Sequence, residues 1–516
     1  MPDYMYMLES RLSPEQYAAL VRIQEIAAAA GTNIYLVGGA VRDLISGMPI
    51  RDLDFAVEGN PTRIVRDLEK GGAQTISENE SLRQAELLLG GDVDVSLAAA
   101  RDEVYARPGN RPDIQFSTIT QDLRRRDFSI NAIAISLNPQ SRGLLLDPAN
   151  GLADLERREV RALSIHSFTN QPVRLLRALR YATRMGFTME TRTADWFRLA
   201  IERGLKDSIS EEDAGSEFRQ VVREDRPAAI LKDWESNGLL HVFDPTIAKR
   251  HPDYEALQRI TRVREDMWSA GLRPRLTAAV TLASLGRLKS GEQKSLLAHL
   301  GFRKIDISAV EDLEGEATKT AKLLAGQKLA LPREAYFFIE KMPLVIMAHI
   351  LAESSNSGAV GKIRNYLNKW KPLRQGLPAA AVELENLGLE RGPKFDKVLE
   401  DFFLAQLAGK ARKPEDRPKI LRKLAGIKEL PKKVEKEEKK KAEKGKGKSE
   451  RKGTSGGQPA ESGEPKSSAS TQAAAGKSNT KAVPVASGQS AQNPPTAQSK
   501  VARKKPAPAK LSRMKK

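Results

Sequence analysis

Two aspartates separated by one residue, Asp52 and Asp54, have the type and spacing of a metal site. In a β-strand, residues i and i+2 point to the same face, so a strand from 51 to 57 would place both carboxylates together. Two neighbouring carboxylates repel each other, and a divalent cation removes that conflict because Mg²⁺ prefers oxygen ligands. The pair therefore predicts a site for two Mg²⁺ ions. Most Asp-x-Asp pairs are turn or strand-end residues, so this prediction depends on further elements.

A second pair, Asp92 and Asp94, repeats the spacing in the segment DVDVSL. Apolar residues alternate with these aspartates, as expected for a strand with one buried face. Either aspartate could supply a third carboxylate, and we favour Asp94 for that role.

A glycine pair follows a short apolar stretch in LVGGAVRD, where Gly38 and Gly39 precede Arg42. Glycines let a phosphate approach the backbone closely, and the start of a helix offers free N–H groups to an anion. Arg42 could add a charge-assisted contact. An ordinary strand-to-helix turn is the alternative, and the segment matches neither a GxGxxG fingerprint nor a P-loop.

The segment RRRDFSINA brings together Arg126, Asp127 and Asn131. Arginine can grip phosphate through two hydrogen bonds, while aspartate and asparagine suit ribose hydroxyls. A basic surface loop is the alternative, but Phe128 and Ile130 indicate that the segment is packed against a core.

A predicted helix from 172 to 185 carries a stripe of four arginines: Arg174, Arg177, Arg180 and Arg184. Residues three and four apart lie on one face of a helix, so these like charges would repel one another. An arginine stripe is usually solvated, but an anionic ligand would relieve this repulsion.

The elements that position these residues fall into two kinds. Ser13, Pro14 and Gln16 predict the start of a helix that ends at Gly31. Apolar stretches then predict strands at 33–37, 51–57, 85–89 and 92–97, with a helix from Gly39 to Ile45. From about 172 to 425 the pattern is helical throughout. We therefore expect an α+β domain with a mixed sheet, followed by an all-helical region.

Composition separates the end of the chain from the rest. Residues 431–516 hold 22 Lys and Arg against 7 Glu, which accounts for +15 of the formal charge of +19. This segment has no Phe, Trp, Tyr or Ile, so we expect a disordered basic tail that either attracts RNA phosphates or is a solubilising extension. The chain of 516 residues has no cysteine, no signal peptide and no apolar stretch long enough to span a membrane, so a cytoplasmic location is expected.

Taken together, the chain resembles the class II tRNA nucleotidyltransferase (CCA-adding enzyme) and bacterial poly(A) polymerase family. The resemblance rests on YLVGGAVRD, RDLDFAVEG, RRRDFSINAIAI, LLDPANGLADLERREVRAL and PVRLLRALRYATRMGF, and it covers residues from about 33 to 245. It implies a polymerase-β-like head at 33–163 after an N-terminal helix at 1–32. A helical neck at 164–250, a helical body at 251–430 and the tail at 431–516 would follow.

The resemblance also implies a role for each motif. Asp52 and Asp54 would bind the catalytic metals, with Asp94 as a third catalytic carboxylate. The nucleotide would contact the residues Gly38, Gly39, Arg42, Arg126, Asp127, Asn131, Gln171, Arg174, Arg177 and Arg180. Arg174 would read the base edge, since in this family the protein itself selects the incoming base.

Two features depart from the family's pattern. The family usually has an acidic pair before the arginine at 174, whereas this chain has Asn170 and Gln171. Gln171 keeps a carbonyl acceptor but loses the charge and gains a donor, so we expect altered base selection. The loop 101–116, a flexible element in the family, contains a Pro-Gly-Asn turn that looks more like A-adding and poly(A)-type members. No HD-type pair is found among the five histidines, so an appended phosphohydrolase domain is not expected.

The resemblance implies a template-independent enzyme that adds C, A or both from CTP and ATP to the 3′ end of tRNA, with Mg²⁺. Two alternatives stay open: a poly(A) polymerase acting on other RNA 3′ ends, and a catalytically degenerate RNA-binding protein. No membrane partner is expected, and the sequence gives no indication of oligomeric state.

Overall fold

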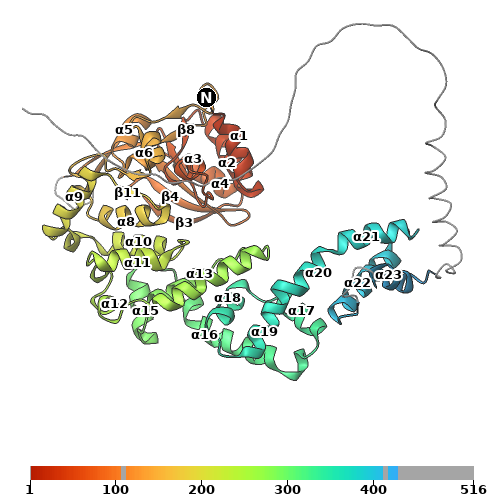
Figure 1. Ribbon diagram of the computed structural model, residues 1–516. Coiled ribbons are helices and arrows are strands. Elements are labelled where there is room, and N and C mark those ends of the chain that lie inside the picture. The colour runs from red at the N-terminus through yellow and green to blue at the C-terminus, as the bar shows by residue number, and fades with distance from the viewer. Residues whose placement is uncertain (1, 106–111, 411–415, 428–516) are drawn as a thin grey trace, which may run out of the picture. The chain divides into compact units, whose positions relative to one another are not determined.

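The computed structural model describes residues 2–105, 112–410 and 416–427. The predicted tail from 431 and the Pro-Gly-Asn turn at 108–110 lie outside these residues. The strands gather in the N-terminal part of the chain, and the part after α9 is built from helices (Figure 1). The expected α+β region followed by a helical region is therefore confirmed.

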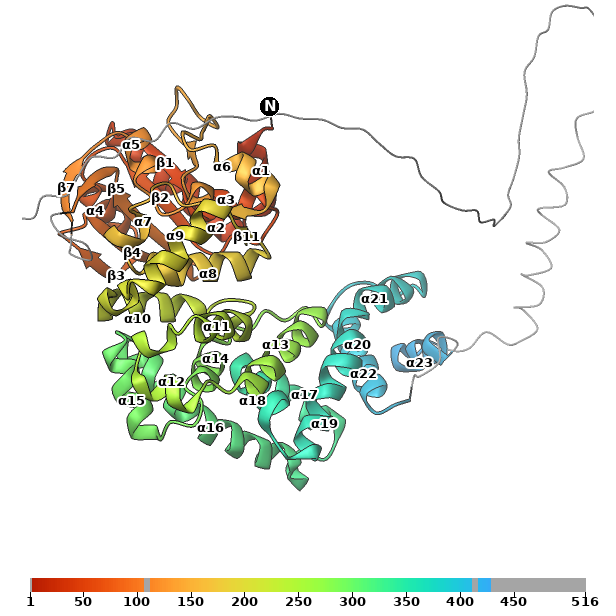
Figure 2. The same cartoon turned by 60° about the vertical axis from the view of Figure 1, so that its left-hand side comes forward.

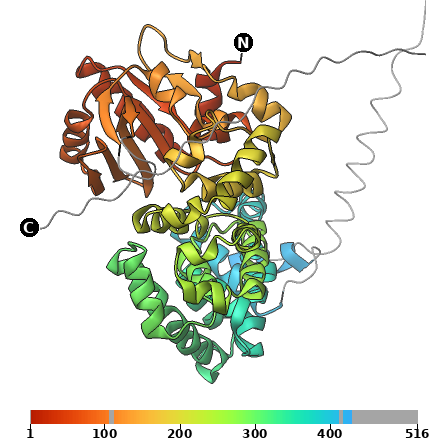
Figure 3. The ribbon, with the colours of Figure 1, turned by 90° about the vertical axis from the view of Figure 1, so that its left-hand side faces the viewer.

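The large sheet is mixed, with the strand order β3-β4-β5-β2-β1-β8-β9. Its central pair β2 and β5 is parallel, and the other neighbouring strands are antiparallel. The strands are seen side by side in Figure 3. Their bounds are β1 Ile34–Val37, β2 Leu53–Val57, β3 Gln74–Asn79, β4 Gln84–Leu89, β5 Val93–Ala99, β8 Ala134–Ser136 and β9 Leu145–Leu146.

Helices of the N-terminal region pack on this sheet and build its core. The predicted first helix is confirmed as α2, Pro14–Ala29, with the full capping box between Ser13 and Gln16. Leu20 and Ile23 of α2 are completely buried. The other helices here are α1 Tyr4–Arg11, α3 Gly39–Ile45, α4 Thr62–Lys70, α5 Ile119–Arg124 and α6 Gly151–Arg157, of which α3 was predicted.

Two small sheets lie outside the large one. A hairpin pairs β6 Arg101–Val104 with β7 Asp113–Phe116. The second sheet pairs β10 Glu159–Val160 with β11 Thr188–Met189 in parallel. The sequence prediction of helices alone after 172 is therefore wrong at β11, because two residues there complete a pair with β10.

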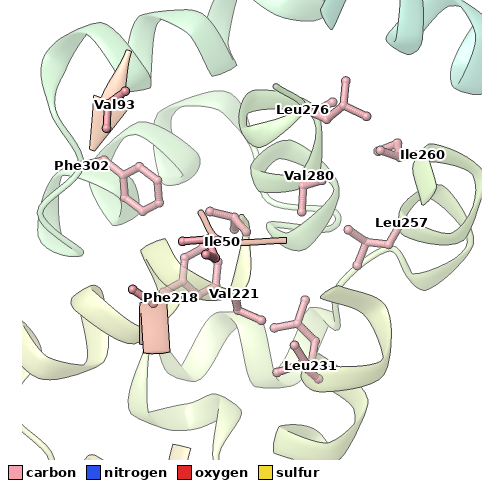
Figure 4. Close-up of a cluster of buried hydrophobic side chains, with 14 of the residues drawn as sticks. Ile50, Val93, Phe218, Val221, Leu231, Leu257, Ile260, Leu276, Val280 and Phe302 are labelled. Atoms are coloured by element: carbon pink, nitrogen blue, oxygen red, sulfur yellow. The ribbon is translucent and has the colours of Figure 1, made fainter. Parts of the chain in front are cut away.

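The helical region begins with short helices, which are α7 Ser167–Asn170, α8 Arg174–Met185, α9 Thr191–Glu202, α10 Glu211–Val221, α11 Pro227–Ser236 and α12 Pro245–Arg250. Of these, α8 contacts β10 and β11. An apolar cluster joins the helical region to the sheet region: Ile50, just before β2, and Val93, the first residue of β5, lie among Phe218, Val221 and Phe302 (Figure 4).

The remaining helices form layers of their own, and α13, α14, α16 and α18 lie side by side (Figure 2). Their bounds are α13 Tyr254–Ser269, α14 Thr277–Ser284, α15 Ser290–His299, α16 Lys304–Ala325, α17 Pro332–Glu340, α18 Leu344–Glu353, α19 Ser357–Asn365, α20 Lys371–Gln375, α21 Leu377–Asn386, α22 Pro393–Leu407 and α23 Asp416–Ala425. Within the described ranges, no single helix is long and apolar enough to cross a membrane. The bent pair α17 and α18, at 118°, meets that criterion only when both are taken together.

Candidate active site

The glycine turn after β1 lies directly against one of the two key aspartates. Gly38 has φ of +65°, a conformation that favours glycine. A Cβ atom there would lie 3.1 Å from Arg126 Nη1 and 3.6 Å from Asp54 Oδ2. A Cβ at Gly39 would lie 3.5 Å from both Asp54 Oδ2 and Arg42 Nη2. The structure thus gathers residues from three of the predicted motifs at one place.

The two aspartates differ in how they are held. Asp54 lies within β2, where its partner on β5 is Ser96. The predicted strand 51–57 begins only at Leu53, so Asp52 lies in a bend just before β2. The expected alternation therefore applies to Asp54 but does not fix Asp52, whose position depends on other contacts.

Both carboxyl groups are electrostatically unfavourable as bare anions. Burial and the charge of Asp52 raise the pKa of Asp54 to about 6, against the effect of Arg126. Burial and the charge of Asp94 raise the pKa of Asp52, against the effect of Arg223. A bound cation would oppose each of these shifts, so the carboxyl pair is chemically suited to a divalent metal.

The set of metal ligands is incomplete in the protein alone. Among the described residues, no cluster of three or more His, Asp or Glu side chains is placed to hold a metal. Asp94 is half-buried, with its Oδ2 4.0 Å from Arg223 Nη1. Mg²⁺ usually keeps waters and binds through one or two carboxylates plus substrate phosphates, so Asp52 and Asp54 with a triphosphate would fit it. The structure does not gather Asp94 as a third ligand, and that role stays a prediction.

The segment 124–132 is packed, as its apolar residues predicted. Phe128 and Ile130 are fully buried. Asn131 lies between two charged groups: its Oδ1 accepts from Arg42 Nη1 at 2.7 Å, and its Nδ2 donates to Asp127 Oδ1 at 3.0 Å. Asn131 therefore links the glycine turn's arginine to the aspartate of its own segment.

Arg42 and Arg126 are both engaged by protein partners. Arg42 is buried, and its Nε donates to Asp43 Oδ1 at 2.9 Å. Arg126 donates from Nε and Nη2 to Asp122 Oδ2, at 3.1 and 2.9 Å. Its side chain is 20% exposed, so a phosphate can reach Arg126 more readily than Arg42.

Three of the four arginines on α8 are paired with carboxylates of the protein, so an external anion is not required to relieve their repulsion; contact of the stripe with the nucleotide stays a prediction. Arg177 Nε and Arg180 Nε donate to the two carboxylate oxygens of Glu217, at 2.7 and 2.9 Å. Arg184 Nη2 donates to Asp43 Oδ2 at 2.6 Å. Burial alone would lower the pKa of Arg180, but Glu217 and other neighbours raise it well above its ordinary value.

Arg177 also reaches the sheet region, with its Nη1 3.6 Å from Asp127 Oδ2. Burial would raise the pKa of Asp127, but Arg177 and Arg174 outweigh burial and lower it. An ionised Asp127 is thus favoured, as the predicted contact with ribose hydroxyls requires.

Gln171 and Arg174 form a hydrogen-bonded ring with the hairpin. Arg174 Nε donates to Gln171 Oε1 at 2.9 Å, and Gln171 Nε2 donates to Glu103 Oε2 at 3.3 Å and to the Tyr105 hydroxyl. Arg174 Nη2 donates to the Arg125 carbonyl at 3.0 Å, and Arg125 Nη1 donates to Glu103 Oε1 at 2.8 Å. Of the two groups expected to select the base, Gln171 is therefore bound to the hairpin, and Arg174 is bound to Gln171 and to the Arg125 carbonyl.

Four residues that hold side chains of the candidate site are not singled out by the sequence: Glu103, Tyr105, Glu217 and Glu224. Glu103 and Tyr105 lie in the loop 101–116, for which the sequence predicts flexibility and a Pro-Gly-Asn turn but no contact with Gln171. Glu217 and Glu224 lie in and just after α10, an ordinary amphipathic helix with acidic residues. The sequence gives one indirect indication of Glu217 and Glu224: the four arginines on α8 have no acidic residues between them, and four like charges on one helix face require partners elsewhere.

The part of the chain that carries this geometry is similar to known proteins. Residues 34–161 match the model of the poly A polymerase head domain. The chain is 28% identical over 419 residues to the A-adding tRNA nucleotidyltransferase of Halalkalibacterium halodurans, covering 80% of this chain and 93% of that protein. It is 26% identical over 416 residues to the CCA-adding enzyme of Levilactobacillus brevis, covering 79% of this chain and 97% of that enzyme. Over about four fifths of its length, the chain is therefore similar to tRNA nucleotidyltransferases of the A-adding and CCA-adding kinds.

The similar proteins differ in length. The A-adding tRNA nucleotidyltransferase of Geobacter sulfurreducens is 24% identical over 407 residues, covering 76% of this chain but only 45% of that protein. The matched head domain contains the glycine turn and the predicted metal ligands, while Gln171 and the α8 arginines lie beyond it. The nucleotidyltransferase head is therefore the best supported part of the site.

Proposed function

We propose that this chain adds nucleotides to the 3′ end of tRNA without a nucleic-acid template, using ATP, CTP or both. The observation that carries the proposal is the convergence of Asp54, the glycine turn and Arg126 beside Asp52 in a segment that matches the poly A polymerase head domain. tRNA follows as substrate from the names of its relatives, which are A-adding and CCA-adding enzymes. A cytoplasmic location is part of the proposal and rests on tRNA as substrate.

Asp52 and Asp54 would hold the two Mg²⁺ ions. When bound, these ions would supply charge neutralisation at the triphosphate and a more acidic 3′ hydroxyl. The protein's own residues would bind and orient the nucleotide. Gly38 and Gly39 leave room for the triphosphate next to Asp54, because any side chain there would enter that space.

In the proposed reaction, the 3′ hydroxyl gives up its proton to solvent, and its oxygen forms a bond to the α-phosphorus of the nucleotide. The bond between that phosphorus and the bridging oxygen breaks, and pyrophosphate leaves. Arg126 would contact the phosphates, and Asp127 with Asn131 would orient the sugar through hydrogen bonds. Catalysis of this kind depends on positioning and charge neutralisation more than on covalent chemistry.

Base choice is the finer part of the proposal. Arg174 and Gln171 would face the base edge once the bonds of Gln171 to the hairpin, and those of Arg174 to Gln171 and the Arg125 carbonyl, are exchanged for bonds to the nucleotide. Two of the three relatives described above are A-adding enzymes, so ATP is the first nucleotide to test.

One assay separates the proposal from its rivals. Purified protein with Mg²⁺ is given tRNA ending before CCA, after C and after CC, with each nucleotide separately. We expect addition of one to three nucleotides and then a stop. Long homopolymers on any RNA would support a poly(A) polymerase, and no addition to any tRNA would support a non-catalytic RNA-binding protein.

A further inference from the structure

The position of Asp52 is set by contacts outside the sheet, because β2 begins one residue later. Gln16 of α2 holds the backbone just before it: Nε2 donates to the carbonyls of Ile50 and Arg51, at 3.0 and 3.3 Å. The Ile50 side chain is buried in the apolar cluster that contains Phe218 (Figure 4). The segment leading to Asp52 is therefore anchored from two sides.

The side chain of Arg51 provides a third anchor, and it reaches the residues that follow α10. Its Nη1 donates to Glu224 Oε2 at 2.8 Å, and its Nη2 donates to Asp225 Oδ2 at 3.1 Å. The Glu224 side chain is only 1% exposed, whereas that of Asp225 is 48% exposed. Glu224 is thus the buried partner of the residue next to Asp52.

Glu224 gathers two more arginines at the same point. Its Oε1 accepts from Arg180 Nη1 at 3.2 Å, and its Oε2 lies 3.4 Å from Arg184 Nε. One carboxylate therefore holds three guanidinium groups that would otherwise repel one another. Without it, Arg51 would keep only Asp225 and Arg184 only Asp43, so both would be held less firmly and could turn toward the neighbouring carboxylate of Asp52.

A purely structural ion pair is the simpler alternative. Buried ion pairs often add little net stability, because desolvation offsets the attraction between the charges. A pair that only joined helices would not involve the residue beside a predicted metal ligand. The direct bond to Arg51, together with the bend at Asp52, favours a role in the geometry of that ligand.

We propose that Glu224 is a positioning residue, which fixes the carboxylate of Asp52 through Arg51 and keeps Arg51 and Arg184 from pairing with it. This inference rests on the proposed function, in which Asp52 holds a catalytic metal. Asp225 supports the same arrangement from the solvent side, because its Oδ1 also lies 3.1 Å from Arg264 Nη1.

The test compares Glu224→Gln, which keeps the shape and removes the charge, with Glu224→Asp and with wild type. Each full-length protein is assayed for Mn²⁺ binding by electron paramagnetic resonance, and for kcat and KM with ATP and tRNA. We expect Glu224→Gln to weaken Mn²⁺ binding and lower kcat by about 10-fold or more, with a smaller change in KM for ATP. Glu224→Asp should recover part of both losses.

Glu353→Gln is the matched control. Glu353 also binds one arginine through two bonds, from Arg259 Nε and Nη2 at 3.1 and 2.7 Å, but it joins α13 to α18. We expect wild-type Mn²⁺ binding and kcat in this control. An equal loss in Glu353→Gln would overturn the inference, since it would show a general effect of lost ion pairs.

Asp225→Asn tests the same arrangement if Glu224→Gln does not fold. This half-exposed residue should give a smaller loss of Mn²⁺ binding and kcat in the same direction. Wild-type values in Asp225→Asn, or in a folded Glu224→Gln, would overturn the inference. If wild type adds nothing to tRNA, the proposed function fails, but the Mn²⁺ comparison still decides the role of Glu224.

Discussion

At the scale of single residues, the carboxyl group of Asp54 lies in an environment that disfavours its ionised form. Burial raises its pKa to about 6, helped by Asp52 and Asp43 and opposed by Arg126 and Arg42. The folded protein therefore binds a proton at Asp54 more tightly than the unfolded chain does. Its contribution to the stability of the fold is therefore fully present at pH values below the pKa of an aspartate in the unfolded chain. That contribution is lost as the pH rises through about 6, the pKa of Asp54 in the folded protein.

The first prediction follows from this loss of stability as the pH rises. In metal-free buffer, Asp54→Asn should be more stable than wild type at pH 7, by about 2 kcal/mol after allowance for solvent screening. The difference should shrink toward pH 5, where wild-type Asp54 is protonated. Thermal melts between pH 5 and 7.5 measure it. An equal pH dependence in both proteins would contradict the assigned pKa.

The second prediction concerns Gln171. An aspartate only accepts hydrogen bonds, and adenine and cytosine share an amino group, so Gln171→Asp should favour ATP and CTP over GTP and UTP. We expect the ratio of kcat/KM values to change by about 10-fold, the size of one discriminating hydrogen bond. Asn170→Asp adds the same charge one position earlier and is the control. Identical nucleotide preferences in wild type and Gln171→Asp would exclude this role.

At the scale of elements, the local signals in the sequence predicted the first helix, the strands β1, β2, β4 and β5, and the helix α3. These elements have caps, glycine turns or clear alternation, which are local properties. The hairpin of β6 and β7 was read only as a flexible loop, and β3 and α4 were not predicted. Strand pairing depends on partners far along the chain, and a single sequence does not reveal them.

The same limit explains which parts of the site the sequence predicted. The motifs around Gly38, Asp54 and Asn131 share one site, and their spacing favoured that arrangement. The partners of the α8 arginines could not be predicted, because Glu217 and Glu224 lie some 40 residues away along the chain. The bend at Asp52 was missed because the apolar alternation extends one residue beyond the strand.

The third prediction concerns α2, because its residue Gln16 both completes the capping box and binds the backbone before Asp52. Ser13→Ala and Gln16→Ala each break the capping box, so each should lower the free energy of unfolding by about 1 kcal/mol. Only Gln16→Ala also removes the bonds to the carbonyls of Ile50 and Arg51. It should therefore lower kcat further than Ser13→Ala does. Equal kcat values in the two variants would show that Gln16 does not help to position Asp52.

At the scale of the whole molecule, the net positive charge is concentrated in residues 431–516, which account for +15 of the formal +19. Residues 431–516 carry 22 of the 85 Lys and Arg. The rest of the chain is close to neutral, so any strong non-specific attraction to RNA should come from this segment.

The fourth prediction uses a truncated chain that ends at residue 430. Removal of the segment should weaken tRNA binding at low salt and reduce the dependence of binding on salt concentration. The value of kcat at saturating tRNA should not change, since the site lies in the first 250 residues. Filter binding at several salt concentrations measures the effect. Unchanged affinity would indicate that the segment only improves solubility.

The most direct test of the central claim is nucleotide addition to tRNA by wild type and Asp52→Ala, with Mg²⁺ and equal protein concentrations. The account predicts that wild type extends tRNA by up to three nucleotides and then stops. Asp52→Ala should lose at least about 1000-fold in rate while its circular dichroism spectrum and melting temperature stay close to those of wild type. Substantial addition by a folded Asp52→Ala would contradict the account.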